Sequence, residues 1–304
     1  MKEIRMPNEE YAYFYSGYEN PVAEVDVKEE VAVYTLDAFN GLVKTPKDTV
    51  STLACQLFNP LTGPIVIKGA EKGDTLKVTI KSIENTSGVA VGACMNTIGG
   101  INATTVTRMI NDPITEKVWI YDYKDGEFTS RENPKLKFRE QPFSGSLGTA
   151  PENEVISSTV PSTFGGNMDV KDMCPGNTLY FPVNVDGAYF YIGDAHGRQG
   201  DGELNGTGLE MAAKFILEFD LIKGKKIEWP RIENDEYIMT VGSARPLEDA
   251  ARIAWCELVE WIVEEYGWDK LDAYELLSKC GEMYLGNMVD PNYSMVAMVK
   301  KEYL

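Results

Sequence analysis

Hydrophobic and polar residues alternate in short runs along the first two thirds of the chain, which is the pattern of β-strands. Residues 22–27, 31–36, 75–83 and 117–123 concentrate β-branched and aromatic side chains in runs of strand length. Turn-forming dipeptides such as Asn40-Gly41 separate these runs. Many short strands with frequent turns favour a sandwich or a distorted barrel over alternating β–α units.

The hydrophobic period changes after Gly242. Residues 246–267 begin with a proline, carry acidic residues in the first turn and repeat apolar residues at helical spacing, which predicts an α-helix. The residues expected on its buried face are Ala251, Ala254, Leu258, Trp261 and Ile262. A second helix is predicted over residues 271–279, and a last strand over residues 293–299.

These patterns predict a mainly β fold, a distorted sandwich or barrel-like arrangement, with a small α+β part at the C-terminus. We expect residues 1–235 to form the β-rich catalytic region, either as one unit or as two β subdomains. Residues 236–304 are expected to form an α+β C-terminal subdomain. A chain of 304 residues with 43% hydrophobic residues can supply a substantial core.

The net charge of the chain limits the kinds of molecule that it is expected to bind. The chain has 47 acidic against 29 basic residues, a formal net charge of -18. Such a surface repels the phosphate backbone of nucleic acids and anionic lipids, so we expect neither nucleic acid nor membrane as a partner. A neutral or cationic small molecule fits the acidity better.

The cysteines and the absence of targeting features point to the cytoplasm. Five cysteines are widely spaced without a C-x-x-C pair, which predicts neither a disulfide framework nor a thiolate zinc site. No apolar run reaches the length of a signal peptide's core or of a membrane span. We therefore expect a cytoplasmic protein with reduced cysteines.

The most distinctive segment is 193–203, which follows the apolar run 188–192 and is rich in glycine and charged residues. We predict that it is a loop that brings polar groups close to a ligand. The chain has one histidine, and so any histidine-dependent chemistry must use His196. In extended backbone, Asp194 and His196 point to the same side and can share a metal ion. The alternative is a histidine satisfied within a tight turn.

Three further places carry candidate polar groups. Gly165 and Gly166 can bare backbone N–H groups, with Asn167 and Asp169 following, although a simple polar turn also explains this run. Glu210 lies in an apolar stretch, where a carboxylate is either exposed on a strand or buried with a partner. Asp37 ends an apolar strand at a turn, where capping is its expected role.

Taken together, these motifs resemble the signature region of the acetamidase/formamidase family. The resemblance lies in residues 165–169, 179–188, 193–203 and 206–210, with further similarity in residues 59–64, 69–76 and 272–278. It implies hydrolysis of formamide or acetamide to ammonia and the carboxylic acid, on a mainly β fold with an α+β C-terminal part. It also implies a homo-oligomer, a dimer or larger.

Amide hydrolysis requires an activated nucleophile, a stabilised oxyanion and a proton for the leaving nitrogen. The leading hypothesis is that a divalent ion, which activates a water molecule, is bound by side chains of the motifs: Asp169, Asp194, His196 and Glu210. Zinc is the first expectation, and calcium or another divalent ion is the alternative. Glu203 and Asp37 are the candidate general base and acid. Asn167 and the backbone amides of Gly165 and Gly166 are the candidates for binding the oxyanion or the substrate amide.

Three alternatives remain open at this stage. One is an enzyme of the same scaffold that acts on a larger amide or an amidine-like compound. A carboxylate such as Glu203 or Asp194 could activate water without a metal, with Arg198 or backbone donors binding the oxyanion of a related substrate. A non-catalytic protein of the same fold could instead bind a small molecule without turning it over.

Overall fold

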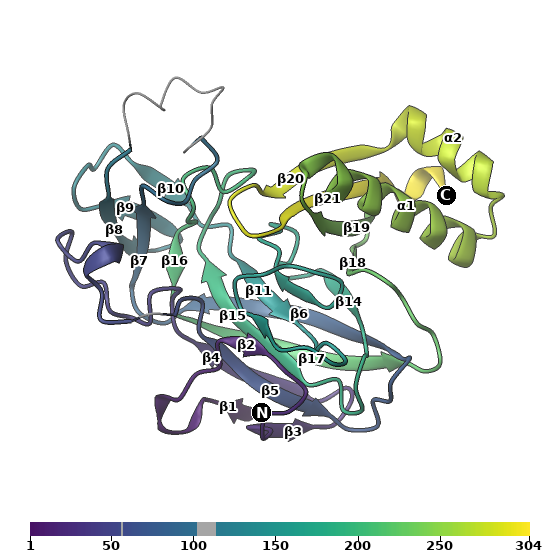
Figure 1. The fold of residues 1–304 in the computed structure, drawn as a ribbon, viewed down its shortest axis with the longest axis horizontal. Coiled ribbons are helices and arrows are strands. Elements are labelled where there is room, and N and C mark those ends of the chain that lie inside the picture. Colours follow the sequence, from purple (N-terminus) through teal and green to yellow (C-terminus); the bar gives the residue numbers. More distant parts are fainter. Residues whose placement is uncertain (56, 102–113) are drawn as a thin grey trace.

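Two large β-sheets pack face to face in the computed structural model, which describes residues 1–55, 57–101 and 114–304 (Figure 1). Within these residues the first sheet has nine strands, in the order β1 (Lys2–Ile4), β4 (Glu30–Thr35), β17 (Ala213–Ile222), β6 (Thr75–Asn85), β14 (Thr178–Pro182), β18 (Arg231–Glu233), β19 (Tyr237–Ala244), β21 (Tyr293–Lys300) and β20 (Glu282–Asn287). Only the pairing of β1 with β4 is parallel among the pairings of this sheet in the described residues.

The second sheet has ten strands within the same residues. Its main path runs β10 (Lys137–Arg139), β9 (Glu127–Ser130), β8 (Lys117–Lys124), β7 (Val89–Cys94), β16 (Glu210–Met211), β15 (Phe190–His196), β11 (Phe143–Gly148) and β13 (Gly165–Asn167). β5 (Leu61–Ile67) pairs with β15 and with β3 (Ala23–Val25), and a separate small sheet joins β2 (Phe14–Tyr15) to β12 (Ile156–Ser157). Neither large sheet closes into a barrel over the described part of the chain.

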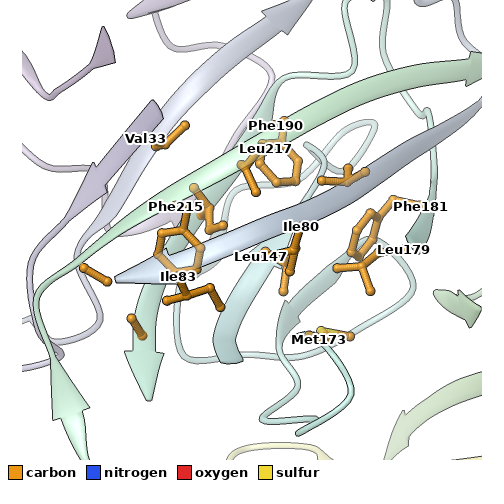
Figure 2. Packing of buried hydrophobic residues seen from close by; sticks show 14 of the residues in the cluster. Val33, Ile80, Ile83, Leu147, Met173, Leu179, Phe181, Phe190, Phe215 and Leu217 are labelled. Carbon is orange, nitrogen blue, oxygen red and sulfur yellow. The ribbon is translucent and has the colours of Figure 1, made fainter. Parts of the chain in front are cut away.

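The space between the sheets is filled by apolar side chains from both of them (Figure 2). Phe190 of β15 meets Phe219 of β17 with ring centroids 5.2 Å apart, and both rings are fully buried. Burying one such side chain stabilises the fold by about 1.5–3 kcal/mol. The alternating positions of the strands thus supply the core that supports the polar residues at their ends.

The predicted mainly β sandwich with a small helical part is confirmed. The strands predicted around residues 22–27, 31–36, 75–83 and 117–123 correspond to β3, β4, β6 and β8. The helix predicted over 246–267 is α1 (Leu247–Tyr266), which ends where Gly267 adopts a left-handed φ of 70°. The second predicted helix is α2 (Lys270–Cys280), and the predicted last strand is β21.

The prediction that residues 193–203 form one loop is wrong at its start, because β15 continues to His196 and is buried along its whole length. Strand β15 lies between β11 on one side and β5 and β16 on the other, which satisfy its backbone groups. Gly193 here allows close packing: a Cβ atom on it would stand 2.4 Å from the carbonyl oxygen of Pro60. Glycine in a central strand can therefore mark a close approach of backbones as well as a turn.

Helices α1 and α2 belong to the C-terminal part, where α1 packs on β19 and β21. The nine-stranded sheet continues through β18 into this part, and the turn between β20 and β21 reaches back toward β15 and β16 (Figure 1). A bridge between Gly202 and Asn287 ties that turn to the segment after His196. The proposed division at residue 236 stays a prediction.

Candidate active site

The pairing of β15 with β16 places candidate acidic residues next to His196. His196 lies directly opposite Glu210 in this antiparallel pair, and so both side chains project from the same face of the sheet. Asp194 precedes His196 by two residues in β15, and its side chain lies on that face as well, 3.4 Å away. The strand register therefore assembles three of the candidate residues.

Two loops add the remaining carboxylates. Asp169 follows β13, and Glu203 lies in the turn after β15. His196 Nε2 is 3.2 Å from Glu210 Oε2, 3.4 Å from Asp194 Oδ1, and 4.0 Å from both Asp169 Oδ1 and Glu203 Oε1. All five side chains are buried.

The atoms that face one another in this cluster lack hydrogen-bond partners in the described part of the chain. Within the described residues, no hydrogen bond reaches Asp169 Oδ1, Asp194 Oδ1, Glu210 Oε2 or His196 Nε2. Leaving one buried polar group unsatisfied costs about 1–3 kcal/mol, and a charged group costs more. Convergence of four such atoms fits a cation among them. Two overlapping groups within the cluster could hold a metal ion: Asp169, His196 and Glu203, and Asp194, His196 and Glu210.

Gln199 fixes the protonation of the imidazole. Its side-chain nitrogen donates to the carbonyl oxygens of Asp169 and Gly286, both at 3.1 Å. The Gln199 oxygen therefore faces His196 Nδ1, at 2.8 Å, and accepts the proton of Nδ1. With Nδ1 used in this bond, the ring directs Nε2 toward the carboxylates, and Nε2 is the nitrogen that could bind a metal ion once its proton is displaced.

Each strand-borne carboxylate uses one oxygen for orientation and leaves the other free. Asp194 Oδ2 accepts from Asn59 Nδ2 at 3.0 Å and from Ser146 Oγ at 3.2 Å. Glu210 Oε1 accepts from the N–H of Gly208 at 2.6 Å. Asp169 is held in the same way, since its Oδ2 accepts from Asn167 Nδ2 at 3.0 Å. Outer partners of this kind orient the ligands of metal sites.

Glycines make room for the cluster. A Cβ atom on Gly145 would stand 2.5 Å from Asp169 Oδ1 and 2.6 Å from Asp194 Oδ2, and one on Gly208 would stand 2.7 Å from His196 Nδ1. Asp169, Asp194 and Glu203 themselves have φ angles of 51°, 53° and 51°. Such left-handed backbone costs of order 1–3 kcal/mol per residue and is found preferentially at functional sites.

The crowding of charge shifts the pKa of each group. Burial raises the pKa of Glu210 to about 7, and burial together with the neighbouring Asp169 holds the pKa of Glu203 well above its usual range. Burial alone would lower the pKa of His196, but the carboxylates of Glu210 and Asp194 outweigh it and raise that pKa well above the ordinary value. Without a metal the cluster therefore retains protons that a bound cation would displace.

A cavity of about 510 Å³ opens onto the cluster, and Asp194, Glu203 and Glu210 are among its lining residues. The C-terminal part contributes Arg245 and Asp290 to the same lining. Asp290 Oδ2 accepts from Asn167 Nδ2 at 2.7 Å, which joins the β20–β21 turn to the polar network. The cavity therefore needs residues from both ends of the chain.

The structure brings Asp169, Asp194, His196, Glu203 and Glu210 together, as the motifs suggested. It does not bring Asp37 to the cluster in the same way: Asp37 Oδ1 accepts from the N–H groups of Phe39 at 2.9 Å and Gly41 at 2.8 Å, and so caps a turn.

The groups considered for binding the oxyanion are engaged elsewhere. Gly165 and Gly166 lie in strand β13, where the N–H of Gly165 donates to Ser162 O at 3.1 Å. Both ends of the Asn167 amide are used, since its oxygen accepts from Asn59 Nδ2 at 2.9 Å and from Ser146, while its nitrogen binds two carboxylates. The Arg198 guanidinium donates to the carbonyl of Arg139 at 3.1 Å.

Sequence patterns missed four residues of the network: Asn59, Ser146, Gln199 and Asp290. Asn59 precedes a proline and resembles an ordinary turn residue, and Asp290 also precedes a proline in a polar turn. Ser146 lies in a short strand with no distinctive motif. Gln199 carried a usable signal, because it lies within the segment rich in glycine and charge, and Asn59 begins the segment 59–64 that contributes to the family resemblance.

The sequence of this chain is similar to a known protein family and to characterised proteins. The sequence profile of the Acetamidase/Formamidase family matches residues 18–163 and 155–302. An acetamidase of Mycolicibacterium smegmatis is 28% identical over 218 residues, 54% of this chain and 53% of the relative. A formamidase of Methylophilus methylotrophus is 26% identical over 217 residues, 54% of this chain and 51% of the relative. The chain thus spans about half the length of these curated relatives.

Solved structures match over almost the whole chain. The crystal structure of an acetamidase from Yersinia enterocolitica is 42% identical, with a TM-score of 0.91 over 97% of this chain and 89% of that one. An acetamidase structure from Bacillus halodurans is 27% identical, with a TM-score of 0.90 over 97% of each chain. Among the described residues, neither helix is apolar enough over a sufficient length to cross a membrane.

Proposed function

Because the chain belongs to the acetamidase/formamidase family, we propose that it hydrolyses primary carboxamides to the carboxylic acid and ammonia at the His196 cluster. One observation carries the proposal beyond family membership. Four buried polar atoms without hydrogen-bond partners in the described residues converge beside a cavity that can admit a small molecule. A purely structural polar network would pair these atoms with one another or with donors.

A divalent cation fits the donor set of Asp169, Asp194, His196 and Glu210. Zinc is the first candidate, because it accepts imidazole and carboxylate ligands together, as iron and manganese also do. Calcium prefers six to eight oxygen ligands, which this cluster with its imidazole satisfies less well. When bound, such an ion polarises a carbonyl oxygen and lowers the pKa of water.

Glu203 is proposed as the general base. Its carboxylate lines the cavity, comes from a loop, and has a pKa that burial and Asp169 raise well above the usual range. It takes a proton from the attacking water as the water oxygen bonds to the amide carbon. The same carboxyl then donates this proton to the amide nitrogen as the C–N bond breaks, and ammonia leaves.

The surrounding residues hold this geometry. Ser146, Asn59 and Asn167 orient the carboxylates, and Gln199 keeps the proton on His196 Nδ1. Since both ends of its amide are occupied, Asn167 is assigned to orientation of the carboxylates and not to contact with substrate. Asp37 is likewise assigned to its turn.

Ammonia release from formamide, acetamide and propionamide tests the proposed activity, with the elemental content of the same preparation measured in parallel. We expect turnover that His196→Ala and Glu203→Gln reduce by about 10²-fold or more. Glu154→Gln is the matched control, because Glu154 is an exposed glutamate that is not among the residues lining the cavity in the described part of the chain. Turnover unchanged in His196→Ala would favour hydrolysis without a metal, and no turnover of any amide would favour a binding protein.

The cytoplasmic location and the homo-oligomeric state stay predictions. Sedimentation of the purified protein tests the second directly, and a monomer at micromolar concentration would contradict it.

A further inference from the structure

The cavity is larger than the smallest amides require. Acetamide has four non-hydrogen atoms, and at roughly 30 Å³ for each water-sized group it fills no more than about a quarter of the space. The volume of about 510 Å³ lies within the range of roughly 300–1,000 Å³ that is typical of pockets for much larger ligands. A substrate as small as acetamide would leave most of this cavity to water.

The part of the lining that is not acidic combines polar residues, among them Tyr13, Ser157 and Arg245, with an apolar wall. Phe39, Val50, Leu57, Phe58 and Met95 all contribute to it. Phe39 and Phe58 meet edge to face with ring centroids 6.1 Å apart, and Phe39 and Val50 are buried in the hydrophobic cluster that rests on β7 and β8. Phe39, Phe58 and Val50 are therefore held in place by the fold, whereas Leu57 lies at the exposed edge of the wall.

The apolar wall begins next to the carboxylates. Phe58 immediately precedes Asn59, whose side chain holds Asp194. On the other side, the N–H of Ala93 in β7 donates to Thr207 Oγ1 at 2.9 Å, and Thr207 lines the cavity close to Glu210. A substrate with its amide carbon at the cluster thus places its next atoms against the apolar wall.

Because the leaving group is ammonia, the acyl end of the substrate must be the part that occupies the rest of the cavity. Release of ammonia requires an unsubstituted nitrogen, and so every additional carbon must belong to the acyl group. We propose that the preferred substrates are primary amides with an apolar acyl group of about six to eight carbons, a straight chain or a ring, and not formamide or acetamide. The proposal rests on the proposed amide hydrolysis.

Kinetics over a series of amides test the proposal: formamide, acetamide, butyramide, hexanamide and phenylacetamide, with ammonia release as the readout. Each methylene that an apolar pocket encloses is worth roughly tenfold or more in specificity. We expect kcat/KM for hexanamide or phenylacetamide to exceed that for acetamide by at least about tenfold. Equal or higher kcat/KM for acetamide overturns the proposal while the proposed function stands. No ammonia from any amide overturns both.

Substitutions of residues that line the cavity test whether the apolar wall determines the substrate preference. Leu57 lines the cavity and is 44% exposed, so Leu57→Ala should leave the fold intact. We expect it to lower the ratio of kcat/KM for hexanamide to that for acetamide by about tenfold. Leu271→Ala on α2 is the matched control, an exposed leucine outside the cavity lining, and should leave the ratio unchanged.

Val50→Phe provides an independent change by filling the apolar end of the cavity. It should lower the same ratio, with a thermal melt to confirm folding. If neither Leu57→Ala nor Val50→Phe changes the ratio, the proposal is wrong.

Discussion

Gly145→Ala is expected to disrupt the His196 cluster while leaving the fold in place. A Cβ atom at this position of β11 would stand 2.5 Å from Asp169 Oδ1 and 2.6 Å from Asp194 Oδ2. Ordinary contacts between carbon and oxygen are about 3.3 Å or longer, and so both carboxylates must retreat by roughly 0.7–0.8 Å. Metal–ligand distances tolerate only about 0.2 Å.

The displacement should affect binding and catalysis far more than stability. A shift of about 1 Å in reacting groups costs roughly 10²-fold in rate, whereas overpacking of this kind typically costs about 1–3 kcal/mol of unfolding free energy. We expect tag-free Gly145→Ala protein to lose most of its bound metal and about 10²-fold in kcat/KM. Elemental analysis, ammonia release and a thermal melt provide the three measurements.

Gly200→Ala is the matched control for this variant. It is the same substitution close to the cluster, but a Cβ atom on Gly200 meets nothing within 4 Å. It should behave as the unchanged protein. Full metal content and full turnover in Gly145→Ala would refute the reasoning that these carboxylates must lie where they do.

Three further predictions concern Gln199 and Glu210 at the site and the Arg231–Glu257 ion pair between β18 and α1. Gln199→Leu removes the acceptor for His196 Nδ1 and should weaken metal affinity by about 10–100-fold in competition with a chelator; unchanged affinity would contradict the assigned tautomer. Metal affinity measured by calorimetry should rise between pH 6 and pH 8, because the pKa of Glu210 is raised to about 7 in the metal-free protein and its proton must leave; affinity independent of pH would count against this. Arg231→Met leaves Glu257 buried without its partner and should lower the free energy of unfolding, measured in urea, by about 3–5 kcal/mol. The double variant Arg231→Met with Glu257→Leu should recover most of this loss. A single variant as stable as the parent protein would show the ion pair to be dispensable.

Local periodicity was sufficient to predict most of the fold. The alternation of apolar and polar residues identified β4, β6 and β8, because one face of each strand packs on the core between the sheets. The apolar stripe and the closing Gly267 identified α1 for the same physical reason. The spacing of Asp194 and His196 also predicted their common direction, since the two residues do lie in one strand.

Other features depend on contacts that no local pattern contains. Asn167 joins Asn59, Ser146 and Asp290, which lie 108, 21 and 123 residues away along the chain, and only the strand pairing reveals that they meet. The misassigned loop around Gly193 has a related cause. Glycine permits a turn and also permits two backbones to approach closely, and only tertiary packing distinguishes the two.

We expect amide hydrolysis by this protein to require a divalent ion at the His196 cluster. The most direct test measures elemental content and ammonia release on one tag-free preparation, before chelation, after it and after readdition of zinc. We expect the purified protein to contain a stoichiometric divalent ion, activity to fall as the ion is removed and to return with zinc, and His196→Ala to retain neither the ion nor activity. Full turnover by protein freed of metal would contradict it.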